Sequence, residues 1–262
     1  MNFLILGAGG IGSYFGARLI ESGNEVSFVA RGKQLQALQQ KKLKLQHPEF
    51  CFEQKVISYN IEEITKLDFS NFDAVLLTTK STSTLALSKL LQICFDNEEK
   101  IPYIVSLQNG VENEEILSEC LNNEYIIAGL TRKIGAHIVS PAVISATGTA
   151  ETILGAIKDT AENQIFLKNL QDAFNQAKIP TFLSSNIKLE LWKKLIINNG
   201  VNAICALLRK ETGVIMHHKK LSKIVYGLMR ETANAALNKG ISISKEDVDE
   251  MFELITNFDS IK

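Results

Sequence analysis

The segment NFLILGAGGIGSYFGARLIESGNEVSFV, residues 2–29, is the strongest indication of the fold class. A short apolar run, residues 2–6, leads into the glycine cluster GAGGIG at 7–12, and apolar residues at helical spacing then continue until Gly23. A second apolar run, residues 25–29, follows at once, as is typical of parallel strands joined by a helix. The pattern predicts a right-handed βαβ unit.

The glycine cluster fits the spacing G-x-G-x-x-G between a strand and a helix. In this motif Gly7 permits the tight turn, Gly9 lets the backbone approach a pyrophosphate, and Gly12 lets the helix pack on the strand. The pyrophosphate lies at the helix N-terminus, where free N–H groups and the positive end of the dipole face it. A purely structural turn is the alternative. We expect a dinucleotide site formed by Gly7, Ala8, Gly9, Gly10, Ile11 and Gly12.

The N-terminal part continues the alternation of strands and helices. Apolar runs at 74–78, 103–107 and 125–130 alternate with helical segments near 81–96 and 112–121. This order predicts a doubly wound α/β domain. From about Ile134 to Leu154, short β-prone runs alternate with turn residues, so we expect an antiparallel appendage there.

The C-terminal part has a different texture. After Pro180 the pattern is helical throughout, and Ser244 with Asp247 forms a near capping box. We expect helices near residues 187–208, 218–239 and 245–257.

The fold class that follows is α/β, with an N-terminal doubly wound Rossmann-type domain and an all-helical C-terminal domain. We expect residues 1–185 to form the dinucleotide-binding domain with its appendage, and residues 186–262 the helical domain.

Composition and charge exclude several function classes. Lys and Arg sum to 28 and Asp and Glu to 29, so the net charge is −1 and no global positive field attracts nucleic acid or anionic lipid. No window approaches the roughly 18–20 apolar residues of a membrane span, and the N-terminus lacks a basic leader. We expect a soluble, cytoplasmic protein.

Cysteines and histidines show no metal-ligand spacing. The four cysteines contain no CxxC pair and are interpreted as reduced, structural thiols. We interpret all four histidines as surface or loop residues, and expect no metal site: His47, His137, His217 and His218.

The second predicted strand ends without a carboxylate. NAD enzymes usually place Asp or Glu there to accept from the ribose hydroxyls, whereas this chain has Arg31, followed by Gly32 and Lys33. A guanidinium forms charge-assisted, bidentate bonds to a 2′-phosphate, which favours NADP over NAD. The alternative is that Arg31 and Lys33 only solvate a loop.

One polar stripe interrupts the apolar helix near residues 187–208. Lys194, Asn198 and Asn202 recur at i, i+4 and i+8, which places them on one face among core-forming residues. We expect them to be partly buried, and buried polar groups need partners, for which a bound ligand would serve. The alternative is a solvated stripe continued by Lys193 and Asn199.

Taken together, these motifs resemble the ketopantoate reductase (2-dehydropantoate 2-reductase) family. The resemblance covers nearly the whole chain, and the lysine–asparagine helix combined with QNG is far more specific than the glycine loop. The matching segments are GAGGIG at 7–12, VAR at 29–31, TTK at 78–80, SLQNGVENEE at 106–115, LWKKLIINNGVNA at 191–203 and RETANAALNKGI at 230–241.

The resemblance implies NADPH-dependent reduction of the 2-keto group of ketopantoate to the pantoate hydroxyl, a step toward pantothenate and coenzyme A. Lys194 occupies the position of the family's general acid, which agrees with the need to protonate an alkoxide. The remaining implied roles are substrate binding by Asn198 and Asn202, contacts at the nicotinamide and substrate by Lys80 and Asn109, and a cofactor contact near Ala136.

The chain also departs from the family pattern. Thr212 stands before Gly213 where the family usually has Asn, and a shorter side chain that still hydrogen-bonds is expected to contact substrate there. Glu112 replaces a frequent Gly. The family continues with a further helix, whereas this chain stops at Lys262, so we expect a truncated helical domain.

Two other functions remain open from the sequence. One is a non-catalytic NADP-binding or sensor protein, and the other is a reductase for a different 2-keto acid. The sequence is also compatible with either a monomer or a homodimer.

Overall fold

The computed structural model describes residues 1–96 and 98–257. The chain divides into two compact units, Met1–Ile187 and Lys188–Lys262. Both β-sheets lie in the first unit, and the described part of the second unit is helical.

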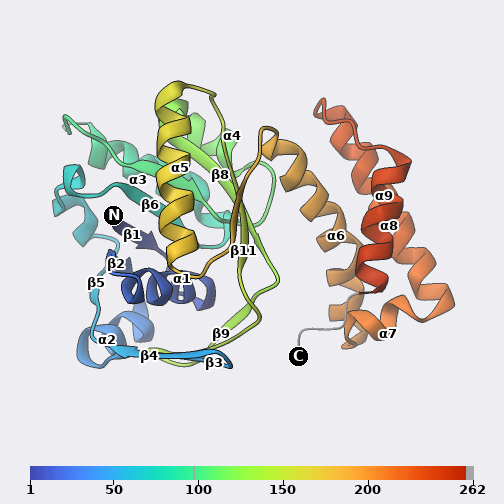
Figure 1. The fold of residues 1–262 in the computed structure, drawn as a ribbon, viewed down its shortest axis with the longest axis horizontal. Coiled ribbons are helices and arrows are strands. Elements are labelled where there is room, and N and C mark those ends of the chain that lie inside the picture. Colours follow the sequence, from blue (N-terminus) through green and yellow to red (C-terminus); the bar gives the residue numbers. More distant parts are fainter. Residues whose placement is uncertain (97, 258–262) are drawn as a thin grey trace. The chain divides into compact units, whose positions relative to one another are not determined.

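An eight-stranded sheet forms the centre of the first unit across the described residues (Figure 1). Neighbouring strands are parallel except for the antiparallel pair β8 and β11. The predicted strands at 2–6, 25–29, 74–78, 103–107 and 125–130 are therefore confirmed. In sheet order the strands are β12 (Thr181–Leu183), β11 (Glu151–Ala156), β8 (Ile126–Arg132), β7 (Tyr103–Ser106), β6 (Ala74–Leu77), β1 (Asn2–Leu6), β2 (Glu25–Val29) and β5 (Ile57–Tyr59).

Alternating side chains of β1 pack against helices on both faces of this sheet. Phe3 and Ile5 belong to the apolar cluster that includes Phe15 of α1 and Phe174 of α5, whereas Leu4 and Leu6 belong to the cluster under α3 and α4. This arrangement confirms the doubly wound prediction. The helices of this unit are α1 (Gly10–Glu21), α2 (Gly32–Gln40), α3 (Thr84–Phe95), α4 (Asn113–Ser118) and α5 (Ala161–Gln176).

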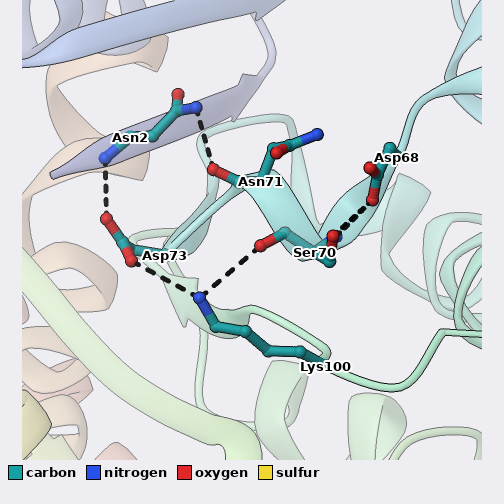
Figure 2. Close-up of polar contacts among 6 residues, drawn as sticks. All are labelled: Asn2, Asp68, Ser70, Asn71, Asp73 and Lys100. Carbon is teal, nitrogen blue, oxygen red and sulfur yellow. Dashed lines mark hydrogen bonds and ion pairs between the residues drawn. The ribbon is translucent and has the colours of Figure 1, made fainter.

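Hydrogen bonds fix the amino end of β1 against the loop before β6 (Figure 2). The Asn2 backbone N–H donates to Oδ2 of Asp73 at 2.9 Å, and the Asn2 side chain donates to the Asn71 carbonyl at 2.9 Å. Lys100 approaches the same loop, with Nζ 3.5 Å from the Ser70 carbonyl and 3.9 Å from Oδ1 of Asp73. These contacts hold the central strand at the edge opposite the glycine cluster.

The predicted antiparallel appendage at 134–154 is only partly correct. β9 and β10 form an antiparallel pair, but β10 also pairs in parallel with β3, far earlier in the chain. β11 joins the main sheet instead. The second sheet has the order β4 (Phe50–Gln54), β3 (Leu43–His47), β10 (Val143–Thr147) and β9 (Gly135–Ser140).

His47 is a correction to the expected surface histidines. It is 8% exposed, and its ring lies 5.0 Å from that of Phe50 and 5.9 Å from that of Tyr14, measured between centroids. Nε2 donates to the Gly148 carbonyl at 2.6 Å, while Nδ1 accepts from the Glu49 N–H at 3.2 Å. The alternating pattern of β3 turns this ring inward, onto α1.

The second unit contains three helices after α6 (Ile187–Leu208) within the described residues: α7 (Thr212–Met216), α8 (Lys219–Asn238) and α9 (Lys245–Thr256). The predicted capping box is confirmed, because Ser244 and Asp247 bond each other's backbone N–H groups. β12 corrects the expectation that everything after Pro180 is helical. None of the described helices is long and apolar enough to cross a membrane.

Candidate functional site

The glycine cluster forms a sharp turn between β1 and α1. Gly7 has φ +113°, in the left-handed region that favours glycine. The N–H groups of Gly7 and Ala8 both donate to the Val29 carbonyl, at 3.1 and 3.2 Å, and the Thr78 hydroxyl donates to the Gly7 carbonyl at 2.8 Å. The turn is therefore held by the ends of β2 and β6, the strands that flank β1.

The other three glycines differ in what surrounds them. A Cβ at Gly12 would lie 2.1 Å from the Gly7 carbonyl oxygen, and one at Gly10 would lie 2.1 Å from the Ala136 carbonyl oxygen. By contrast, nothing lies within 4 Å of a Cβ built at Gly9, the N-cap residue of α1. Gly10 and Gly12 thus allow close packing, whereas Gly9 leaves open space at the helix N-terminus.

The other residues of the cluster are positioned by packing. Ala8 is buried in the main core, and Ile11 is half-buried against it. Ala136 lies in β9 with its carbonyl beside Gly10, so the structure places this residue next to the glycine cluster.

Two exposed cations follow β2 at the same edge of the sheet. Arg31 is the N-cap of α2, and Lys33 lies in its first turn. Since β1 and β2 are parallel with Leu6 opposite Val29, both cations follow the strand end that neighbours the glycine cluster. Within residues 1–96 and 98–257, neither side chain forms an ion pair or hydrogen bond.

Segments after β6 and β7 meet through a buried glutamine. Gln108 is 3% exposed, and its Nε2 lies 3.1 Å from the Thr79 hydroxyl, 3.2 Å from the Thr79 carbonyl and 3.3 Å from the Lys80 carbonyl. The side chains of Lys80 and Asn109 are exposed. Gln108 directly precedes Asn109 and bonds to the Lys80 carbonyl, so it holds the segments of these two expected contact residues close together. No role for Gln108 was predicted from the sequence.

A second buried layer supports this glutamine. The Thr84 hydroxyl lies 3.2 Å from Oε1 of Gln108 and 3.0 Å from Oδ1 of Asn113, and Nδ2 of Asn113 donates to the Asn109 carbonyl at 3.2 Å. Gln108 stands in the QNG motif, which was the available sequence signal, but only the structure reveals that its side chain points inward.

The lysine–asparagine stripe in the second unit is partly buried, as its spacing predicts. Lys194 and Asn198 are half-buried, whereas Asn202 is exposed, which corrects the expected burial of all three. Burial lowers the pKa of Lys194 to about 8, from an ordinary value of 10.5. Among the described residues no ion pair or hydrogen bond to the Lys194 amine offsets this effect.

Neighbouring polar residues on α6 have partners within the same unit. Lys193 forms an ion pair with Asp247 at 3.0 Å, and Nδ2 of Asn199 donates to the Thr232 hydroxyl at 3.4 Å. These two residues therefore connect α6 to α9 and α8. Lys193 and Asn199 therefore do not simply continue a solvated stripe along α6, because both contact other helices.

Thr212 is half-buried at the start of α7, where its hydroxyl lies 3.8 Å from Sγ of Cys205. Cys205 and the other three cysteines are free. The described residues contain no cluster of His, Cys, Asp and Glu that could hold a metal ion.

We predict that adding one methyl group destabilises the fold at Gly10 but has little effect at its neighbour Gly9. Gly10→Ala directs a Cβ at the Ala136 carbonyl and is expected to lower the free energy of unfolding by about 1–3 kcal/mol or more. Gly9→Ala enters open space at an ordinary φ of −79° and should change it by less than about 1 kcal/mol. Urea unfolding measures both. Equal destabilisation of the two variants would contradict this account of the loop.

Comparisons with known proteins identify one family. Residues 3–159 match the model of ketopantoate reductase PanE/ApbA, and residues 186–260 match that of the ketopantoate reductase PanE/ApbA C terminal. The 2-dehydropantoate 2-reductase of Pyrococcus abyssi (strain GE5 / Orsay) is 32% identical over 256 residues, which cover 97% of this chain and 80% of the relative. That of Pyrococcus horikoshii is 31% identical over 263 residues, covering 100% and 81%.

Solved structures agree with this assignment. The 2-dehydropantoate 2-reductase from Geobacter metallireducens GS-15 has a TM-score of 0.84 at 28% identity, covering 100% of this chain and 84% of that one. D-mandelate dehydrogenase with NADH and anilino(oxo)acetate has a TM-score of 0.85 at 24% identity, covering 98% and 79%, and supports the fold alone. The chain belongs to the ketopantoate reductase family.

Proposed function

We propose that this protein reduces 2-dehydropantoate (ketopantoate) to pantoate with NADPH, a step toward pantothenate and coenzyme A. The observation that carries the proposal is Lys194, an amine with a pKa near 8 and no described partner, in a chain of this family. Strongly shifted groups of this kind cluster at functional sites. A non-catalytic cofactor-binding protein has no need for such a lysine.

In this proposal, residues 1–185 bind the cofactor, and residues 186–262 bind the substrate and supply the proton. The open space at Gly9 and the N-terminus of the 12-residue helix α1 suit a pyrophosphate, because N–H groups there lack intrahelical acceptors. Arg31 is the candidate for a ribose 2′-phosphate, and Lys80, Asn109 and Ala136 for further contacts.

The step assigned to this chain's own residues is the donation of a proton by Lys194. When bound, NADPH supplies a hydride to the keto carbon of the substrate. The carbonyl oxygen then gains negative charge. The Lys194 ammonium stabilises this charge and donates a proton to the oxygen. A pKa of about 8 keeps this group mostly protonated at neutral pH while making it a far better acid than water.

Asn198, Asn202 and Thr212 are assigned to substrate binding. Amide N–H groups and a hydroxyl suit the carboxylate and the hydroxyl of ketopantoate, since each donates hydrogen bonds without adding charge. This assignment leaves Lys194 as the cation of the stripe, so its proton serves the reacting oxygen.

Steady-state assays test the proposed reaction directly. We expect NADPH oxidation to depend on ketopantoate, with a higher kcat/KM than for other 2-keto acids. Preference for another 2-keto acid would keep the reaction class and change the substrate. NADPH binding without oxidation by any keto acid would favour the sensor alternative and contradict the proposal.

Arg31→Ala tests cofactor preference. NADPH is expected to bind more tightly than NADH. The substitution should reduce the ratio of the two dissociation constants by about 10- to 100-fold, because charge-assisted bonds to the 2′-phosphate are lost. Fluorescence titration with both cofactors measures the effect. Lys41→Ala, at the other end of α2, is the matched control and should leave the preference unchanged. Equal affinities of the unmutated protein for both cofactors would show that Arg31 only solvates its loop.

Lys194→Ala tests the proton donor. Cofactor binding and fold are expected to persist while kcat falls about 10²–10⁴-fold, the usual contribution of a positioned general acid. Lys188→Ala, an exposed lysine on the same helix, provides the control. Because the protonated form is lost as pH rises through the pKa of the free enzyme, kcat/KM of the unmutated enzyme should decline above about pH 8. Unchanged kcat in Lys194→Ala would assign the proton to another group.

A further inference from the structure

Gln34 in the first turn of α2 connects three segments of the first unit. Its Nε2 donates to the Ala8 carbonyl at 3.0 Å, and its Oε1 accepts from the Ala142 N–H at 2.9 Å. The side chain is half-buried, and both ends of its amide are used.

Each connected segment bears on the glycine cluster. Ala8 lies within the cluster, and α2 begins directly after Arg31. Ala142 forms the turn between β9 and β10 with φ +64°, and β9 also places the Ala136 carbonyl against Gly10. Gln34 therefore ties the start of α2 to the cluster and to the hairpin that covers it.

The amide group suits this place better than any other side chain of its length. The nitrogen must face a carbonyl and the oxygen must face an N–H, so only one orientation satisfies both bonds. Glutamate would place an acceptor against the Ala8 carbonyl, and methionine would supply neither bond. The two bonds thereby fix the position of the first turn of α2.

The distance between the glycine cluster and the start of α2 matters for a ligand that contacts both of them. The open space at Gly9 lies on one of them, and the Arg31 side chain extends from the other. An exposed arginine loses side-chain entropy on binding, so its contribution depends on a backbone already held at the correct distance.

We propose that Gln34 is a positioning residue for cofactor discrimination: it holds the Arg31 end of α2 at a fixed distance from the glycine cluster. This inference rests on the proposed binding of NADPH at this edge of the sheet. It assigns to Gln34 no contact with the cofactor.

A purely structural role makes a different prediction. A residue that only braces the fold would affect NADPH and NADH equally, because both share the pyrophosphate. A residue that positions Arg31 affects NADPH more, because only NADPH carries the 2′-phosphate. The ratio of the two dissociation constants therefore separates the roles.

The experiment compares Gln34→Met with Gln36→Met, an exposed glutamine of the same helix with no described side-chain bond. Titration of the full chain with each cofactor should show NADPH weakened about tenfold more than NADH in Gln34→Met, and no change of ratio in Gln36→Met. In an Arg31→Ala background, Gln34→Met should change the ratio no further, since both act on the same contact. Gln34→Asn, one methylene too short to make both bonds, should reproduce the selective loss if the methionine variant does not fold.

The outcomes distinguish this inference from the proposed function. An unmutated chain that binds neither cofactor would overturn both. A chain that prefers NADPH, but keeps its ratio in Gln34→Met and Gln34→Asn, would overturn the role of Gln34 alone. An equal loss of both cofactors would leave Gln34 as a structural brace and would likewise overturn it.

Discussion

The architecture of the first unit depends on one close approach of backbone to backbone. The first turn of α1 lies against the Gly7 carbonyl, at a distance that leaves no room for a Cβ at Gly12. The glycine turn before α1 is held in place as well, because the N–H groups of Gly7 and Ala8 donate to the Val29 carbonyl and the Gly7 carbonyl accepts from the Thr78 hydroxyl. Because β1, β2 and β6 are parallel and in register, their carboxyl ends meet at one edge of the sheet. The close contact at Gly12 places the start of α1 at this edge, where open α/β sheets bind ligands.

The two units offer different chemistry. The first presents helix N–H groups and the exposed cations Arg31 and Lys33, which suit an anionic cofactor. The second contains a half-buried amine whose charged form is disfavoured by desolvation. Its neighbour Lys193 is paired with Asp247, so structural and chemical roles fall on adjacent residues of one helix.

Local patterns were sufficient where the structure is determined by local geometry. The βαβ unit, the parallel sheet and the capping box of Ser244 follow from glycines, apolar spacing and side chains close together in sequence. The four-stranded sheet did not follow, because Leu45 of β3 pairs with Ile144 of β10, far away in the chain. The inward position of His47 was missed because its carbonyl partner, Gly148, is also far away in the chain. Spacing on α6 identified the face shared by Lys194 and Asn198, but not the depth of each residue, so Asn202 was misjudged.

The supporting residues of the candidate site were the least predictable. Gln34 and Gln108 are single amides in polar segments, and their roles rest on carbonyl groups of other segments. Such residues show no periodic pattern in the sequence, because a single side chain makes each interaction. The residues expected to contact the ligands were suggested by motifs instead, since a motif keeps its spacing in sequence.

In the proposed reaction, this chain transfers a hydride from NADPH to the keto carbon of ketopantoate. The most direct measurement uses NADPH labelled with deuterium at either face of the nicotinamide C4, followed by mass spectrometry of the product. We expect pantoate with one deuterium on the carbon that bears the new hydroxyl, from one of the two labelled forms. Ketopantoate recovered unchanged, or pantoate without label from both forms, would contradict it.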